Sequence, residues 1–500
     1  MDRIHQLIED KPDADLAILD FDETQITYGE LRHHSADLAD LLAAHGVRSG
    51  DRLVLVAENC ALYGAAIFAA SQLNAWITLV NARQSATELD AVLAHSGARC
   101  AIFTTVVSAA ALDHADRMGA VSLGTIGRHP VRVSPVRNVQ VEPVKPNASQ
   151  VAALLYTTGT TSAPKGVMLT HDNLIFNAQG SQSISKQQPG DQVLAVLPGT
   201  HVYGFASLFL PTMRGGASVR FVPRFDPVQT IHHLRHGITH YPAVPQMLAA
   251  IIAHLHAVGE SPDCPRLRLL ATGGAPLDPN LKTRVQDMFG LPLNNGYGLT
   301  ETAPTVSVTR SASPRGDCAV GDPLSDVDVR VDQPNAEGIG ELQVRGRNIM
   351  AGYYRDPART AEVMTDDDYF RTGDLARIGP DGALHIVGRL KELIIRSGFN
   401  IYPPEIEAML TRHNDVYQAA VIGRHVPGNE EVLAFVITNG NVTEATICAW
   451  LKEQLAAYKI PQHILIVDAY PVAATGKILK HKLVAHFADL LAERDAMASA

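Results

Sequence analysis

Short apolar runs alternate, along the first two-thirds of the chain, with segments whose apolar residues recur at helical spacing. The run DRLVLVA at 51–57 predicts a buried strand, and the pattern that follows predicts a helix from about 62 to 73. Further strand-like runs begin near residues 101, 193, 218 and 267. Alternation of this kind is typical of an α/β protein.

Two of the predicted helices carry clear end signals. Thr27 and Glu30 can form a capping box for a helix that should stop near Gly46. Asp226 is placed to cap another helix, with proline at its first position and Gly237 as its end.

The pattern changes after residue 327, where short strands and turns (VDVRV, GELQVRG, ALHIVGR) predict a β-rich subdomain. The segment GRLKE at 388–392 combines glycine with charged residues and is the predicted domain boundary, although a surface hairpin can have the same composition. Residues 393–500 carry their own helix and strand pattern. The predicted fold class is therefore α/β: a large N-terminal domain of αβ layers with a β-rich subdomain, plus a small α+β C-terminal domain.

Composition narrows the possibilities. A chain of 500 residues exceeds the usual size of one core, so two or more domains are expected. A net charge of -10 argues against nucleic acid as the main partner. The five cysteines form no CxxC pair, which suits a reducing compartment and supplies no zinc framework. No signal peptide or apolar stretch of membrane-spanning length occurs, so the sequence predicts a soluble cytoplasmic protein.

The segment YTTGTTSAPKG, from Tyr156 to Gly166, has the chemistry of a phosphate-binding loop. Its hydroxyl groups alternate with glycine, which lets the main chain approach a polyphosphate, and Lys165 adds a positive charge. Proline before the lysine and glycine after it do not fit the Walker pattern, so kinase and GTPase interpretations lose support. Taken alone, the segment could equally be a flexible polar loop.

Further segments follow in a fixed order: NNGYGLTE, FRTGDLA, GRLKELIIRSGFNIYPPEIE and TGKILK. Together they resemble the acyl-adenylate-forming superfamily of acyl-CoA synthetases, aryl-CoA ligases, peptide-synthetase adenylation domains and beetle luciferase. The resemblance covers nearly the whole chain. It implies an enzyme that uses ATP and Mg²⁺ to convert a carboxylic acid to an acyl-adenylate, and then passes the acyl group to the thiol of coenzyme A. It also implies an AMP-binding domain at 1–388, a hinge at 389–392 and a mobile domain at 393–500.

The resemblance assigns catalytic roles to four residues. Lys477 in TGKILK matches the lysine placed over the forming acyl–phosphate bond, and Thr300 matches a phosphate ligand. Glu301 matches the Mg²⁺ ligand, which suits a cation that prefers one carboxylate plus phosphate oxygens. His201 in HVYG matches the histidine at the mouth of the acyl pocket, although a lone histidine beside apolar residues is more often a core residue.

The same comparison implies a binding site for ATP or AMP. The ring of Tyr297 matches the residue that stacks on adenine, and Asp374 matches the carboxylate that accepts both ribose hydroxyls. Arg389 matches the arginine near the ribose and phosphates. The complete implied set is Thr157, Thr158, Gly159, Thr160, Thr161, Ser162, Lys165, Gly273, Gly274, Ala275, Asn295, Gly296, Tyr297, Gly298, Asp374 and Arg389.

Two positions of the phosphate loop depart from the family pattern. Thr158 stands in place of the usual serine, and Ser162 in place of the second glycine. Both side chains carry a hydroxyl, so phosphate binding should survive and the effect should fall on the rate.

The second half-reaction is implied to follow a rotation of the small domain. Lys391 matches the hinge residue, and Gly398 matches the glycine beside the pantetheine tunnel of coenzyme A. A carrier protein's pantetheine uses the same arm, so an enzyme that loads a carrier protein is the alternative. A nucleotide-sensing scaffold is disfavoured because Lys477, Glu301, Asp374 and Arg389 are all present.

The acyl pocket is predicted from small and apolar residues in the segments that should surround it. No arginine or lysine lies in these segments to hold a second carboxylate, so a monocarboxylic acid, either fatty or aryl, is favoured. The predicted pocket residues are His201, Ala206, Ala243, Val244, Gly274 and Ala303.

Three histidines, His232, His236 and His240, fall at metal-ligand spacing. Gly237 is expected to end the helix between them, so a metal site there is disfavoured.

Overall fold

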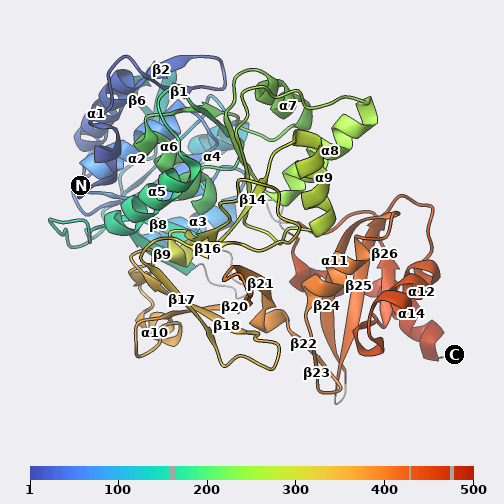
Figure 1. Cartoon of the computed structure of the whole chain (residues 1–500). Helices are drawn as coiled ribbons and strands as arrows, with labels where there is room; N and C mark the ends of the chain where they lie inside the picture. Colours follow the sequence, from blue (N-terminus) through green and yellow to red (C-terminus); the bar gives the residue numbers. More distant parts are fainter. Residues whose placement is uncertain (158–164, 427–428, 473–477, 500) are drawn as a thin grey trace.

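The computed structural model of the protein describes residues 1–157, 165–426, 429–472 and 478–499. Within these ranges the chain forms two large β sheets with helices between and around them, a four-stranded sheet and a smaller C-terminal part (Figure 1). The predicted α/β fold class is confirmed.

The carboxyl ends of several strands of the first large sheet border a cleft. Its strands β1, β10, β11, β12, β13 and β14 run parallel, and the other strands are antiparallel additions at its edges. In spatial order the described strands are β16 (Asp322–Pro323), β15 (Thr305–Val308), β14 (Leu293–Gly298), β13 (Leu269–Thr272), β12 (His240–Ala243), β10 (Gln192–Ala195), β11 (Ser218–Phe221), β1 (Leu16–Leu19) and β2 (Gln25–Thr27).

The second large sheet carries the phosphate-loop segment between two of its strands. Strands β3, β4, β5 and β8 are parallel, and β9 returns antiparallel to β8. In spatial order the described strands are β19 (Gly352–Tyr353), β9 (Lys165–Thr170), β8 (Val151–Thr157), β4 (Trp76–Asn81), β3 (Arg52–Ala57), β5 (Cys100–Phe103), β7 (His129–Val133) and β6 (Val121–Ile126).

Helix α2 is buried on every side along 61–71, as expected for a helix that is apolar all round. It shares one hydrophobic core with Leu55 of the second sheet and Val219 of the first. The capping box at Thr27 is confirmed, and Asp226 accepts from the Gln229 backbone as predicted. The described helical elements of this part are η1 (Ile4–Ile8), α1 (Tyr28–Ala44), α2 (Ala61–Gln72), α3 (Ala86–Ser96), α4 (Ala109–Arg117), α5 (His171–Ser185), η2 (Tyr203–Phe209), α6 (Leu210–Gly215), α7 (Pro227–Arg235), α8 (Pro245–Val258), α9 (Pro279–Phe289), η3 (Thr300–Thr302) and α10 (Pro357–Glu362).

The predicted β-rich subdomain is a four-stranded antiparallel sheet. Its described strands, in order, are β17 (Val327–Asp332), β18 (Gly340–Gly346), β20 (Phe370–Ile378) and β21 (Leu384–Arg389).

The C-terminal part has a core of its own, formed by residues such as Ile406, Val421 and Leu451. Strands and helices occur where the sequence pattern predicted them. The described elements are η4 (Leu390–Glu392), β22 (Ile394–Arg396), β23 (Phe399–Ile401), α11 (Pro403–Leu410), β24 (Val416–Val426), β25 (Asn429–Thr438), α12 (Glu444–Gln454), η5 (Ala457–Lys459), β26 (His463–Ile466), η6 (Lys480–Lys482), α13 (Leu483–His486) and α14 (Ala488–Ser499).

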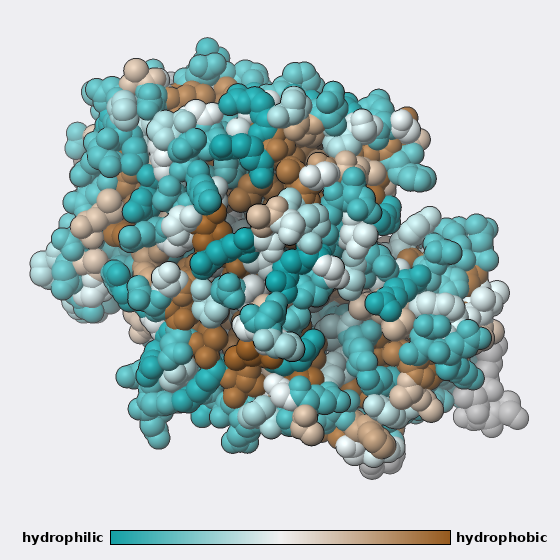
Figure 2. Space-filling model, in the orientation of Figure 1, coloured by the Kyte–Doolittle hydropathy of each residue, from teal (hydrophilic) through white to brown (hydrophobic). Residues whose placement is uncertain are grey.

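The parallel strands of the first sheet end along one edge, where ligands of open α/β sheets usually bind. Figure 2 shows a largely hydrophilic face whose hydrophobic residues gather toward its middle, where the parts of the chain meet. Across the described ranges, none of the helices combines the length and apolar character needed to cross a bilayer.

Candidate active site

A cleft of 3420 Å³ opens at the carboxyl ends of strands β10, β12, β13 and β14. The four-stranded sheet and the C-terminal part complete its walls. The structure brings most of the predicted site residues to this one cleft. Those that line it are Thr157, Lys165, His201, Gly273, Gly274, Ala275, Asn295, Gly296, Tyr297, Gly298, Thr300, Glu301, Asp374, Arg389 and Lys391.

The end of β14 turns tightly into the segment that carries Thr300 and Glu301. At Gly298 any β-carbon would come within 2.0 Å of the Pro304 carbonyl oxygen, so only glycine fits. Gly273 follows the neighbouring strand, and a β-carbon added to it would lie 3.0 Å from the Gly296 carbonyl oxygen. These close approaches bring two backbone edges together at the floor of the cleft.

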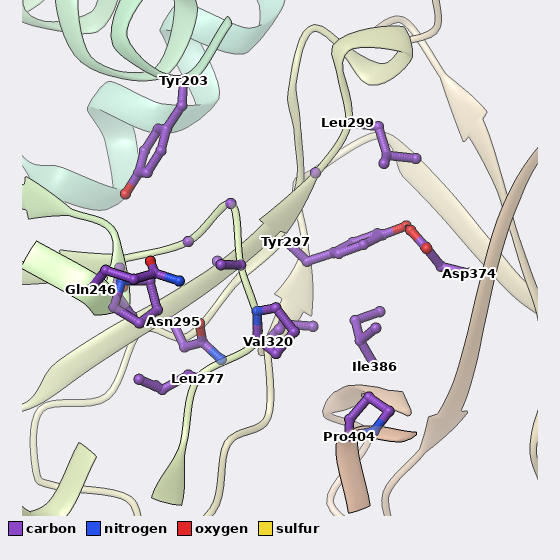
Figure 3. Close-up of a pocket in the computed structure, with 18 of the residues that line it drawn as sticks. Tyr203, Gln246, Leu277, Asn295, Tyr297, Leu299, Val320, Asp374, Ile386 and Pro404 are labelled. Atoms are coloured by element: carbon purple, nitrogen blue, oxygen red, sulfur yellow. The ribbon is translucent and has the colours of Figure 1, made fainter. Parts of the chain in front are cut away.

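Tyr297, Asp374 and Arg389 lie together on one side of the cleft, joined by a hydrogen bond and an ion pair; Figure 3 shows the Tyr297 hydroxyl beside the Asp374 carboxylate. The Tyr297 hydroxyl donates to Asp374 Oδ2 at 2.6 Å, and Arg389 Nε lies 3.1 Å from Asp374 Oδ1. Burial, together with the Asp374 carboxylate, raises the pKa of Tyr297 well above its usual value, so its hydroxyl stays a donor. Strand pairing places Asp374 of β20 opposite Arg389 of β21.

Glu301 and Lys165 both lie close to Tyr353, a residue that sequence reasoning missed. The Tyr353 hydroxyl donates to Glu301 Oε1 at 2.9 Å, and Lys165 Nζ lies 5.9 Å from the centre of the Tyr353 ring. The three residues come from η3, β9 and β19, which are far apart in the sequence. No local motif could have shown this arrangement.

Another part of the cleft combines apolar and polar side chains. Leu277 lines it beside the polar side chains of Gln246 and Asn295 (Figure 3). The Tyr203 hydroxyl points into the cleft toward this side, and burial raises the pKa of Tyr203 above its usual value. Sequence reasoning missed Tyr203 although it lies in the HVYG segment that contains His201.

Four of the predicted acyl-pocket residues do not lie on the cleft wall. Ala206, Ala243 and Ala303 are fully buried behind it, and Val244, although half-buried, is not part of the lining. Side chains alternate along a strand, so Ala243 points away from the cleft when its neighbour Pro242 lines it. Of the predicted pocket residues, His201 and Gly274 line the cleft.

The C-terminal part presents one particular face to the cleft. Residues 411–414 and 478–482 line it, whereas Gly398 lies outside it, exposed on the β22–β23 hairpin with a φ of +81°. The predicted site residues Thr158, Gly159, Thr160, Thr161, Ser162 and Lys477 lie outside the described residues.

The three histidines at metal-ligand spacing have separate environments. Helix α7 ends at Arg235, and the rings of His232 and His236 lie 4.3 Å apart near the surface. His240 is buried on β12, where its ring nitrogens contact the Thr239 hydroxyl and the Ser185 carbonyl oxygen.

Comparison with known proteins assigns the family. Residues 6–354 match the family described as AMP-binding enzyme, and residues 405–477 match the AMP-binding enzyme C-terminal domain. The chain therefore belongs to the AMP-binding enzymes of the acyl-adenylate-forming superfamily. It is an AMP-forming acyl-CoA synthetase, and ATP is the nucleotide that this family uses.

Individual relatives agree with this class. A feruloyl-CoA synthase of Amycolatopsis sp. is 35% identical over 474 residues, covering 93% of this chain and 94% of the relative. The 4-coumarate–CoA ligase 5 of Oryza sativa subsp. japonica is 30% identical over 516 residues, covering 97% and 94%.

Solved structures share the fold over the whole chain. ATP-bound MatB from Rhodopseudomonas palustris has a TM-score of 0.84 at 28% identity, covering 98% of this chain and 100% of MatB. The apo form of the same enzyme has a TM-score of 0.74, and the comparison again covers 98% of this chain and 100% of MatB.

Proposed function

We propose that the protein joins an aryl monocarboxylic acid of the hydroxycinnamate type to coenzyme A. The carboxylate attacks the α-phosphorus of ATP, which forms an acyl-adenylate and releases pyrophosphate. The thiol sulfur of coenzyme A then attacks the acyl carbon, the bond to AMP breaks, and the thiol proton passes to solvent. The observation that carries the proposal is the convergence of Lys165, Glu301, Asp374 and Arg389 on one cleft.

The nucleotide end of the cleft fits ATP by charge and hydrogen bonding. Asp374 would accept the ribose hydroxyls, and the ring of Tyr297 would lie against adenine. Lys165 and Arg389 would face the phosphates, with Lys477 completing the charge over the reacting carboxylate. Mg²⁺, when bound, would neutralise phosphate charge, and Glu301 fits it because this cleft carboxylate supplies the hard oxygen that Mg²⁺ prefers.

The acyl end of the cleft supports an aryl acid that carries a ring hydroxyl. Tyr203 and Gln246 offer neutral hydrogen-bonding groups beside Leu277. The segments 201–209, 240–247 and 271–277, which were predicted to surround the acyl group, contain no arginine or lysine that could hold a second acid group. The names of the feruloyl-CoA synthase and 4-coumarate–CoA ligase relatives point the same way.

Bonds on either side of Lys391 support it as the hinge. Arg389 is fixed to the N-terminal body through Asp374 and the pairing of β20 with β21. Glu392 lies 3.5 Å from Lys480, which also contacts Glu407 of α11 at 2.7 Å. Rotation of residues 393–500 as one domain would therefore be absorbed by the backbone of Leu390 and Lys391.

Exposure of Gly398 outside the cleft fits an arrangement suited to adenylate formation. In the second half-reaction the β22–β23 hairpin would have to turn toward the cleft, which would bring Gly398 beside the pantetheine arm. The higher TM-score with ATP-bound than with apo MatB supports this assignment.

Mass spectrometry of the products tests the proposal. The purified protein is incubated with ATP, Mg²⁺ and a mixture of ferulate, 4-coumarate, cinnamate, octanoate and sulfoacetate, with and without coenzyme A. The 4-coumaroyl and feruloyl thioesters should dominate, and Tyr203→Phe should narrow the preference for 4-coumarate over cinnamate, which lacks the ring hydroxyl. Predominant octanoyl-CoA would refute the aryl assignment. An acyl-adenylate that persists in the presence of coenzyme A would indicate a carrier-protein acceptor.

A further inference from the structure

Strand β19 brings Tyr353 beside the strand that leaves the phosphate-loop segment. Tyr353 pairs with Val167 of β9, and the Tyr354 backbone N–H donates to the Gly166 carbonyl at 2.7 Å. The first residue of β9 is Lys165. The backbone of Tyr353 is therefore fixed relative to a residue that faces the phosphates in the proposed function.

The same short segment also holds Glu301. The Met350 backbone N–H donates to the Glu301 carbonyl oxygen at 2.9 Å, and the Tyr353 hydroxyl donates to Glu301 Oε1 at 2.9 Å. Both the main chain and the carboxylate of Glu301 are thus tied to residues 350–353.

Tyr353 itself has little freedom to move. Tyr353 is 6% exposed, and its backbone N–H donates at 2.9 Å to the hydroxyl of Thr360 in α10, which packs against β19. A hydroxyl on a ring held in this way is a fixed donor.

We propose that Tyr353 is a positioning residue for the metal site: its hydroxyl occupies one oxygen of Glu301 and orients the other toward Mg²⁺ on the ATP phosphates. The inference rests on the proposed function, in which Glu301 is the Mg²⁺ ligand. A carboxylate turns readily about its last side-chain bond, and Mg²⁺ demands near-octahedral geometry. A fixed donor removes that rotation before the metal arrives, as outer partners of metal ligands commonly do.

The neighbouring tyrosine is a matched control. The Tyr354 hydroxyl donates to Glu142 Oε1 at 2.6 Å, and Tyr354 is 4% exposed. It does not line the cleft. Tyr354→Phe therefore removes a buried tyrosine–carboxylate bond of the same kind, one residue away, without touching the proposed metal site.

Calorimetric titration with ATP, in Mg²⁺ and separately in EDTA, tests the assignment. Tyr353→Phe keeps the ring and should weaken Mg²⁺·ATP binding about 10-fold, within the range found for partners of metal ligands. The affinity of Tyr353→Phe for metal-free ATP should change by less than about 2-fold. Tyr354→Phe should change the affinity for ATP by less than about 2-fold both with Mg²⁺ and with EDTA. In a Glu301→Gln background, Tyr353→Phe should weaken Mg²⁺·ATP binding by less than about a further 2-fold, because the hydroxyl acts through the carboxylate.

Two results would overturn the assignment. Equal loss of affinity for metal-free and Mg²⁺-bound ATP in Tyr353→Phe would mean that the hydroxyl serves the nucleotide or the fold. Unchanged affinity for Mg²⁺·ATP would mean that Glu301 needs no such orientation. Failure of the proposed function is distinguishable, because it would appear in the wild type as no gain in ATP affinity from Mg²⁺.

Discussion

Replacing Asp374 with asparagine should remove most of the preference for a complete ribose. Asp374 is 3% exposed, and its oxygens already face the Tyr297 hydroxyl at 2.6 Å and Arg389 Nε at 3.1 Å. A carboxylate has lone pairs left for both ribose hydroxyls. In Asp374→Asn an amide N–H₂ group, which is a donor, replaces one acceptor oxygen. This group must then face the Tyr297 hydroxyl, Arg389 or the ribose.

The magnitude follows from the kind of hydrogen bond that is lost. A bond to a charged acceptor contributes about 1.5–3 kcal/mol, so two ribose hydroxyls on Asp374 contribute about 3 kcal/mol or more together, which corresponds to a preference of at least roughly 100-fold for ATP over 2′,3′-dideoxy-ATP. If one neutral hydrogen bond of about 1 kcal/mol to the ribose remains in Asp374→Asn, the preference for ATP falls to roughly 5-fold. The preference should therefore shrink by about 10-fold or more in Asp374→Asn.

The assay is kcat/KM of adenylate formation with each nucleotide, measured by pyrophosphate release. Asp328→Asn is the matched control, since Asp328 also holds a tyrosine hydroxyl and an arginine, Tyr369 and Arg345, but away from the cleft. The control should leave the preference unchanged. An equal loss with both nucleotides in Asp374→Asn would refute ribose binding and leave Asp374 as a support for Tyr297 and Arg389.

Two further predictions concern the domain contact and the pH dependence of folding. The Thr411 hydroxyl donates to Asp278 Oδ2 at 2.5 Å and joins the C-terminal part to α9, so Thr411→Val should slow adenylate formation about 5-fold relative to thioester formation from supplied acyl-adenylate. Equal slowing of both steps would contradict this. Burial lowers the pKa of His171 from 6.5 to about 3, so its contribution to stability is present above pH 6.5 and is lost as the pH falls toward 3. At pH 5 the free energy of unfolding should have lost about 2 kcal/mol for this reason. Urea unfolding of His171→Gln should lack this part of the decline, and a pH profile identical to that of the wild type would contradict the prediction.

Local signals in the sequence predicted the elements of this fold well. The capping box at Thr27, the cap at Asp226 and the β-rich subdomain after residue 327 each depend on residues close together in the chain. Which small residues would reach the cleft depended on strand orientation and helix packing instead. Ala243 and Ala303 have the right size and lie in the right segments, yet both face the core.

Tyr353 shows why the site itself could not be completed from the sequence. Motifs predict residues that contact the substrate, because substrate chemistry restricts their type and spacing. The side chain that orients Glu301 is 52 positions away and reaches it only because β19 pairs with β9. That pairing is made by backbone groups, which nearly any residue could supply, so no local pattern records it. If Tyr353 positions Glu301 for the metal, part of the affinity for Mg²⁺·ATP depends on the order of strands in the second sheet, and the phosphate-loop lysine and the metal ligand share one support.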